Sequence, residues 1–230
     1  MLYTKRGALP MKKISILILS VAMLFVISGC DNSIKYPYEH IGIYDTKTQQ
    51  NIDIGDSKDK VDKILGSCKK DEYNFYSYVD NLSIHYNNNN EVDFISTSFY
   101  DFSNEYNNER YTLADDTNYK STVTDFINTY DYVYECEYEH SPYNNVCVLL
   151  KNENNKIIQI SPDKLEEIKE FSVNKTYTQM QEPYPYDLYR VMIYYSSYNN
   201  LEMFSIDKIE CPAQNHPVPI NWNLFKKIDK

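Results

Sequence analysis

The chain has no glycine after Gly66, and this absence limits what the rest of the sequence can fold into. Phosphate-binding loops, dinucleotide fingerprints and nucleophile elbows each need closely spaced glycines, because backbone must approach a ligand or adopt a strained turn. The sequence contains none of these motifs. Asparagine, which tolerates left-handed backbone geometry, is therefore expected to form the tight turns.

Alternating apolar residues on both sides of a run of four asparagines predict a β-hairpin in the first half of the chain. A two-residue turn would place Tyr86 opposite Glu91. A three-residue loop instead pairs Tyr86 with Val92 and Ile84 with Phe94, so that one face of the hairpin stays apolar. We therefore expect the second register.

A short helix is expected in front of this hairpin. Asp56 or Ser57 can cap its start, Gly66 can end it, and the apolar residues between them recur at helical spacing. A strand over residues 73–79 then leads into the hairpin. Together these elements form a first α+β unit over residues 40–103.

The same order of elements returns over residues 110–161, where Asn154 takes the place of Asn89 at the centre of the hairpin loop. Asp116 or Thr117 is expected to cap the helix of this second unit. The apolar face of that helix contains Tyr119, Val123, Phe126 and Ile127. A repeated unit is stronger evidence for its fold than a single one.

Residues 162–230 are expected to hold a helix, a third hairpin and a C-terminal tail. Ser161-Pro162 is typical of a helix start, and the third hairpin turns at Asn199-Asn200. The sequence therefore predicts an α+β fold of tandem helix-plus-antiparallel-hairpin units. These units would form a mostly antiparallel sheet packed by short helices.

The N-terminal segment has the pattern of a secretory signal peptide. Lys12-Lys13 gives a positive end, and an apolar run over residues 14–27 follows it. The run is shorter than the roughly 20 residues that a membrane-spanning helix needs. We expect Met11 to be the true start, since residues 1–10 add nothing that a signal requires.

The signal ends in Ile27-Ser28-Gly29-Cys30, which resembles the bacterial lipobox. This resemblance implies cleavage between Gly29 and Cys30 and lipid attachment to the Cys30 thiol. Residues 1–29 would then be a signal peptide and residues 30–39 a lipidated cysteine with a polar tether. The mature protein is expected on the extracytoplasmic face of the cell membrane, held there by its lipid.

Charge excludes one class of partner. Removing residues 1–29 takes four basic residues and no acidic ones, which lowers the net charge from −10 to −14. A chain this acidic is not expected to bind nucleic acid, because it cannot neutralise phosphates. Its 24 tyrosines can anchor a protein partner or stack on a glycan, although strand-rich cores also absorb tyrosine.

Residues 54–66 carry a further resemblance. Ile54-Gly55-Asp56-Ser57-Lys58, then Val61 and Leu65-Gly66, resembles the opening of small outer-membrane-assembly lipoprotein domains and of the related β-lactamase-inhibitor-protein-like tandem repeats. The resemblance implies a binding or assembly domain without a catalytic site. Ser67-Cys68 departs from the usual Gly-x-Pro, and the second unit lacks both glycines.

With Cys30 lipidated, four cysteines remain. Cys136 and Cys147 lie symmetrically about Ser141-Pro142, so a turn there would place them directly opposite each other as a candidate disulfide. Cys68 and Cys211 would pair only by elimination. No Cys-x-x-Cys spacing is present, so neither a zinc site nor a thioredoxin-like motif is expected.

No local motif predicts catalysis, a metal or a cofactor. The histidines are far apart in sequence: His40, His85, His140 and His216. A calcium loop fails, because the series Asp53, Asp56, Asp59 and Asp62 does not follow EF-hand spacing. Helix capping explains the aspartates better, and the stripe Glu135, Glu137 and Glu139 is typical of a solvated strand face.

These patterns favour a non-enzymatic binding or assembly module whose working surface is a Tyr-rich and acidic sheet face. The alternatives are an extracytoplasmic enzyme or enzyme accessory acting on cell-wall or carbohydrate substrates, and a lipid-tethered sensor. A deep pocket where histidines and carboxylates converge would favour the enzyme. A shallow face with clustered aromatic residues would favour the binding module.

Overall fold

The computed structural model divides the chain into two compact units, Met1–Ser33 and Ile34–Lys230. The structure describes residues 39–72, 74–99, 109–136, 144–154, 156–173, 187–196, 199–209 and 224–230, all within the second unit, and the side chains of 170–173 are not among them. The expected signal peptide, its cleavage site and Cys30 lie outside these residues. No helix in the described part of the chain is long and apolar enough to cross a membrane.

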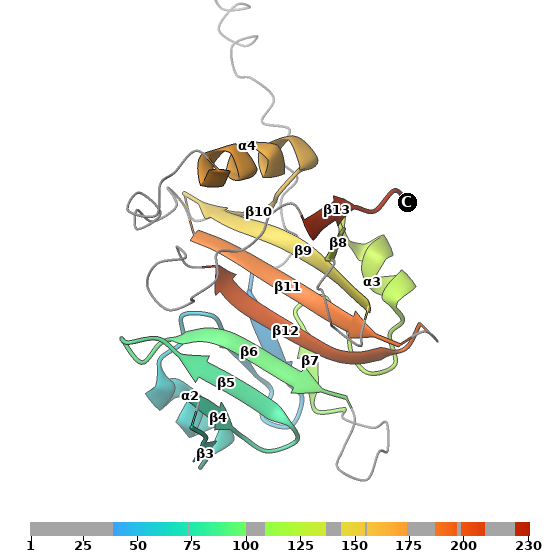
Figure 1. Ribbon diagram of the computed structural model, residues 1–230. Helices are drawn as coiled ribbons and strands as arrows, with labels where there is room; N and C mark the ends of the chain where they lie inside the picture. The colour runs from blue at the N-terminus through green and yellow to red at the C-terminus, as the bar shows by residue number, and fades with distance from the viewer. Residues whose placement is uncertain are drawn as a thin grey trace, which may run out of the picture. The chain divides into compact units, whose positions relative to one another are not determined.

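The described residues form an α+β fold with mostly antiparallel sheet, as the sequence predicts (Figure 1). The strands of the larger sheet are, in spatial order, β13 (Phe225–Lys227), β8 (Tyr134–Cys136), β9 (Asn144–Glu153), β11 (Asp187–Tyr195), β12 (Leu201–Ile209), β6 (Val92–Ser98), β5 (Leu82–Tyr86), β4 (Phe75–Ser77) and β3 (Lys69–Lys70). Strand β10 (Lys156–Gln159) pairs with β9, on the edge that β8 also uses. The three expected hairpins thus contribute to one sheet.

A smaller sheet has the order β2 (Gln50–Asp53), β1 (Gly42–Asp45) and β7 (Tyr111–Leu113). Strands β1 and β2 are consecutive, whereas β7 comes from a segment far along the chain, and Asp45 pairs with Tyr111 across the sheet. The buried carboxylate of Asp45 accepts two hydrogen bonds from Arg110, at 2.9 and 2.7 Å. This bidentate pair fixes the register of β1 against β7.

The first helix, α2 (Lys58–Leu65), agrees with the sequence prediction. Ser57 caps its start by accepting a hydrogen bond from the Lys60 backbone N–H, and Gly66 ends it with a φ of 84°. The buried face of α2 contains Val61 and Leu65. Glycine is required at the C-cap because a Cβ is disfavoured at positive φ.

The second helix, α3 (Val123–Thr129), begins later than predicted, and the caps proposed at Asp116 and Thr117 are wrong. Thr122 is the N-cap, and its side chain and that of Asp125 satisfy each other's backbone N–H in a capping box. Asp116 has a φ of 63°, whereas a residue that caps a helix start has extended backbone geometry, so Asp116 is not a helix cap. The reciprocal box outweighs the isolated caps.

The third helix, α4 (Pro162–Val173), starts at Pro162 as predicted, and Ser161 accepts a hydrogen bond from the Lys164 backbone N–H. Its buried residues include Leu165 and Ile168. Figure 1 shows α4 beside β10 and β9, at the end of the sheet away from β4 and β5.

The first hairpin has the predicted pairing of Tyr86 with Val92, but the predicted pairing of Ile84 with Phe94 is wrong. Ile84 pairs with Ile95, and His85 pairs with Phe94. The register shifts by one because a β-bulge inserts an extra residue into β6. Phe94 therefore turns away from the core, and Ile95 enters it.

The other two hairpins also turn at asparagine. In the second, Glu153 pairs with Lys156, so its loop is one residue shorter than predicted. The third turns before Leu201, which pairs with Tyr195. Asparagines with positive φ are Asn74, Asn81, Asn90, Asn154 and Asn199. The expectation that asparagine replaces glycine in the turns is confirmed at these positions.

The larger sheet separates two apolar clusters. One face packs against α2, α3 and the smaller sheet through residues such as Val61, Phe126 and Ile43. The other face packs against α4, but only over β13, β8, β9, β11 and the end of β12. On that second face, the side chains of β4, β5 and β6 are half-buried or exposed. Within the part of the chain that the structure describes, the sheet is thus covered on both faces at one end and on one face at the other.

Candidate functional site

The uncovered part of the second sheet face, which we call the open face, is the first candidate site. Its side chains come from β4, β5 and β6, and the register places them in two rows. One row contains Ser77, Ser83 and Ser96. The other contains Phe75, His85 and Phe94. Small hydroxyl-bearing residues therefore lie beside a row of rings.

The open face also carries a carboxylate, at a β-bulge. Asp93 is the extra residue between Val92, which pairs with Tyr86, and Phe94, which pairs with His85. Its Oδ1 lies 2.6 Å from Nδ1 of His85. Bulges often re-aim side chains near functional sites, and this one orients the imidazole of His85.

The rings of the open face pack edge to face. The ring of Phe75 lies 5.4 Å from that of His85 and 5.5 Å from that of Phe94, centroid to centroid, with a T-shaped geometry in the second case. All three rings are half-buried. An aromatic surface is left accessible to a partner.

An ion pair ends the ring row. Asp207 of β12 pairs with Phe94, and Arg190 of β11 pairs with Asp207 in the next strand. Arg190 donates Nε and Nη2 hydrogen bonds to the two carboxylate oxygens of Asp207, both at 2.9 Å. Because Arg190 and Asp207 neutralise each other, this ion pair marks the edge of the open face and does not present a free charge there.

The arrangement lacks the remaining parts of a hydrolytic triad. Within the described residues, no serine hydroxyl hydrogen-bonds to His85, which contacts Asp93 and Phe75. The described residues also contain no group of three His, Cys, Asp or Glu side chains that could hold a metal ion. The rings and hydroxyls of the open face can stack and hydrogen-bond with a ligand.

Comparison with known proteins adds no further evidence. The chain matches no family model, no curated protein and no solved structure. The resemblance to outer-membrane-assembly and β-lactamase-inhibitor-protein-like domains therefore stays a prediction.

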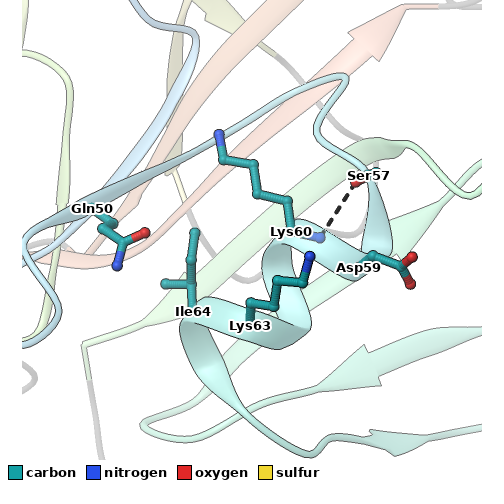
Figure 2. A pocket seen from close by; sticks show the side chains of 6 residues that line it. All are labelled: Gln50, Ser57, Asp59, Lys60, Lys63 and Ile64. Atoms are coloured by element: carbon teal, nitrogen blue, oxygen red, sulfur yellow. Dashed lines mark hydrogen bonds between the residues drawn. The ribbon is translucent and has the colours of Figure 1, made fainter.

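The second candidate is a hollow of about 470 Å³ on the outer side of α2 (Figure 2). The side chains around it are those of Gln50, Ser57, Asp59, Lys60, Lys63 and Ile64. The hollow is open to solvent, and Lys60 is paired with Asp56 at 2.7 Å. It resembles a surface groove between β2 and α2 more than a binding pocket.

A third group of reactive side chains, the Lys58 cluster, joins α2 to the hairpin. The Lys58 ammonium lies 2.5 Å from Asp62 and over the rings of Tyr76 and Tyr86, at 4.9 and 5.7 Å from their centroids. Tyr78 donates a 2.6 Å hydrogen bond to Asp62. Burial lowers the pKa of Lys58, but its hydrogen bond to Asp62, together with the charges of Asp62, Cys68 and Tyr76, outweighs burial and raises that pKa. The charges of Lys58 and Asp62 neutralise each other, so the role of the cluster is to hold α2 against the hairpin.

The predicted cysteine pair is brought together, but not by the predicted geometry. Cys147 lies opposite Tyr134, so Cys136 is diagonal to Cys147 rather than directly opposite. Their sulfurs nevertheless lie 3.0 Å apart in a buried position. Cys68 is half-buried, with its sulfur 3.9 Å from Lys58 Nζ, and Cys211 lies outside the described residues.

The other residues singled out by sequence do not converge. His40 pairs with Asp53 at 3.2 Å, far along the chain from the His85–Asp93 pair. His140 and His216, like Glu137 and Glu139, lie outside the described residues. Glu135 is exposed on β8, as expected of a solvated strand face.

The expectation of a Tyr-rich working face is not met where the structure describes the chain. Tyrosines with less than a tenth of their surface exposed are Tyr78, Tyr86, Tyr111, Tyr130, Tyr134 and Tyr189. Tyr44, at 37%, is the most exposed of the described tyrosines. Sequence reasoning missed the open face because Phe94 and Ile95 are both apolar, so alternation alone could not show which one leaves the core.

Proposed function

We propose that this protein is a lipid-anchored, extracytoplasmic binding or assembly module that acts without catalysing a reaction. The lipobox-like segment ending at Cys30 supports the anchor and the location at the cell membrane. The open face supports the binding role, with a protein or a glycan as partner. No nucleic acid is expected as a partner, because the mature chain is strongly acidic.

The observation that carries the proposal is the bulged Asp93–His85 pair set among half-buried rings. A bulge fixes His85 on a sheet face that the second apolar cluster leaves uncovered. Rings and hydroxyls on one flat surface can stack on a sugar ring or enclose an apolar side chain of a protein. Shallow faces of this kind suit binding better than chemistry, which needs an enclosed cleft.

A photo-crosslinking residue placed at Ser83 tests the proposal in intact cells. The open face should form a crosslinked adduct, whereas the same residue at Asp59, in the hollow beside α2, should form little. Protease treatment of the adduct identifies a protein partner, and a muramidase identifies a cell-wall glycan. Equal yields at Ser83 and Asp59 would contradict a binding role for the open face.

An extracytoplasmic enzyme acting on cell-wall or carbohydrate substrates is the second candidate, and the His85–Asp93 pair favours it. A carboxylate that orients an imidazole is also an acid–base arrangement. The wild-type protein would then hydrolyse purified cell walls, and the His85→Ala variant would not. A protein without such hydrolysis that still crosslinks at Ser83 fits the binding module.

A further inference from the structure

Two cysteines meet at the edge of the larger sheet. Cys136 ends β8 and Cys147 lies in β9, and their sulfurs are 3.0 Å apart. The register explains the contact. Tyr134 lies opposite Cys147, and side chains two residues apart in a strand share a face, so Cys136 and Cys147 point to the same side.

The two sulfurs are shielded from solvent. Cys136 is 3% exposed and Cys147 is 0% exposed, and both belong to the apolar cluster that includes Met192 and Phe225. Burial raises the pKa of the Cys147 thiol, so this thiol is a poor nucleophile in the folded, reduced protein. The sulfur separation of 3.0 Å is about 1 Å longer than a disulfide bond, so a small movement brings the two atoms to bonding distance.

We propose that Cys136 and Cys147 form a structural disulfide in the mature protein. The bond would link β8 to β9 and, through the pairing of Cys136 with Phe225, would also hold β13 at the sheet edge. Strand β8 pairs with β9 over Tyr134 and Glu135. A covalent link therefore replaces hydrogen bonds that so short a ladder cannot supply.

The reaction is a thiol–disulfide exchange. Each cysteine loses its S–H proton, the Cys136–Cys147 bond forms, and the disulfide of the oxidant breaks to give two thiols. The two electrons pass to that oxidant, a protein or small-molecule disulfide of the extracytoplasmic compartment. This location rests on the proposed export. Because both sulfurs are buried, the exchange takes place before β8 and β13 pack.

One tryptic fragment isolates the pair. Residues 121–151 contain both cysteines, no other cysteine, and no Lys or Arg before Lys151. Full-length protein extracted from membranes is denatured, alkylated and digested with and without prior reduction. The proposal predicts an unlabelled fragment, lighter by two hydrogen atoms, that takes two labels only after reduction. The control Cys68→Ser should leave this result unchanged.

Refolding separates this proposal from the proposed export. The chain made in a reducing cytoplasm, then unfolded and refolded with glutathione disulfide, should form the same bond. Oxidation of the folded, reduced chain should be many times slower, since the sulfurs are buried. A fragment that takes two labels without reduction in both the membrane-derived and the refolded protein would overturn the disulfide. A bond in the refolded protein but not in the membrane-derived protein would count against export alone.

The effect on stability supplies a second readout. A disulfide closing a loop of this length lowers the unfolding equilibrium constant by about 100-fold, which raises Tm by roughly 5–10 °C. Oxidised and reduced wild-type protein have the same sequence, so no cavity complicates the comparison. Tm of the Cys136→Ala/Cys147→Ala variant should not respond to reductant. An unchanged wild-type Tm on reduction would contradict a structural bond.

Discussion

Asp93 lies beside His85 in a β-bulge, with its Oδ1 2.6 Å from Nδ1 of the imidazole. Without the bulge, regular pairing from Tyr86 and Val92 would still place Asp93 opposite His85, but Phe94 would follow the alternation into the core. The bulge instead turns Phe94 outward, next to Phe75. One inserted residue thus adds an aromatic ring to the face that carries the His85–Asp93 pair.

Asp93→Ala should separate binding from stability. The Asp93–His85 pair is partly exposed, so its loss should lower the free energy of unfolding by about 1 kcal/mol or less. The crosslinking yield from Ser83 should fall several-fold, because His85 loses its orientation. Urea unfolding and the yield of adduct check the two effects. A variant with unchanged yield would show that the pair does not contribute to binding.

Arg110→Met should destabilise the fold strongly. Asp45 is fully buried, and removing the guanidinium leaves its charge without a partner, which costs about 3–5 kcal/mol. The matched control is Lys120→Met, which breaks an exposed ion pair with Glu109 and should leave the free energy of unfolding almost unchanged. Similar unfolding free energies for the two variants would contradict the role assigned to the Arg110–Asp45 pair.

The protein should lose stability steeply in alkali. Burial raises the pKa of seven tyrosines: Tyr78, Tyr86, Tyr111, Tyr134, Tyr189, Tyr194 and Tyr195. In the unfolded chain these phenols ionise near pH 10, so the unfolded state releases protons first. Stability is therefore complete below about pH 9 and falls as the pH rises through about 10. Urea unfolding across this range measures the loss. Phenolate absorbance that reaches its full value while the near-ultraviolet circular dichroism stays native would contradict it.

Thr122→Ala should lower the free energy of unfolding by about 1 kcal/mol, because it removes one half of the capping box with Asp125. Asp116→Asn is the control at the cap that sequence predicts. Asparagine tolerates the positive φ at this position, so the control should cost almost nothing. A larger loss at position 116 than at Thr122 would mean that α3 starts earlier.

Local signals were sufficient where one residue decides the geometry. Ser57 and Gly66 define α2, Pro162 starts α4, and asparagines form the turns. The start of α3 was missed because Asp116 and Thr117 each look like a cap, whereas the actual cap depends on two side chains acting together. Such reciprocal contacts are visible in sequence only as a weak Thr-x-x-Asp pattern.

Long-range pairings could not be predicted from sequence. Nothing near Asp45 indicates that Arg110, far along the chain, would neutralise it. The adjacency of β12 and β6 likewise depends on how whole hairpins pack, which periodicity does not encode. The closeness of Cys136 and Cys147 was predicted from their symmetry about Ser141-Pro142. The predicted register is nevertheless wrong, because Cys147 lies opposite Tyr134 and not Cys136.

The lipid anchor is the central claim, and the mass of the N-terminal tryptic fragment of membrane-extracted protein tests it most directly. The account predicts a fragment that begins at Cys30, ends at Lys35 and carries a diacylglycerol thioether. Cys30→Ala should yield no such fragment and should leave the membrane fraction depleted of processed protein. Recovery of an unmodified fragment that runs from Ile14 through Gly29 to Lys35 in the wild-type protein would contradict the account.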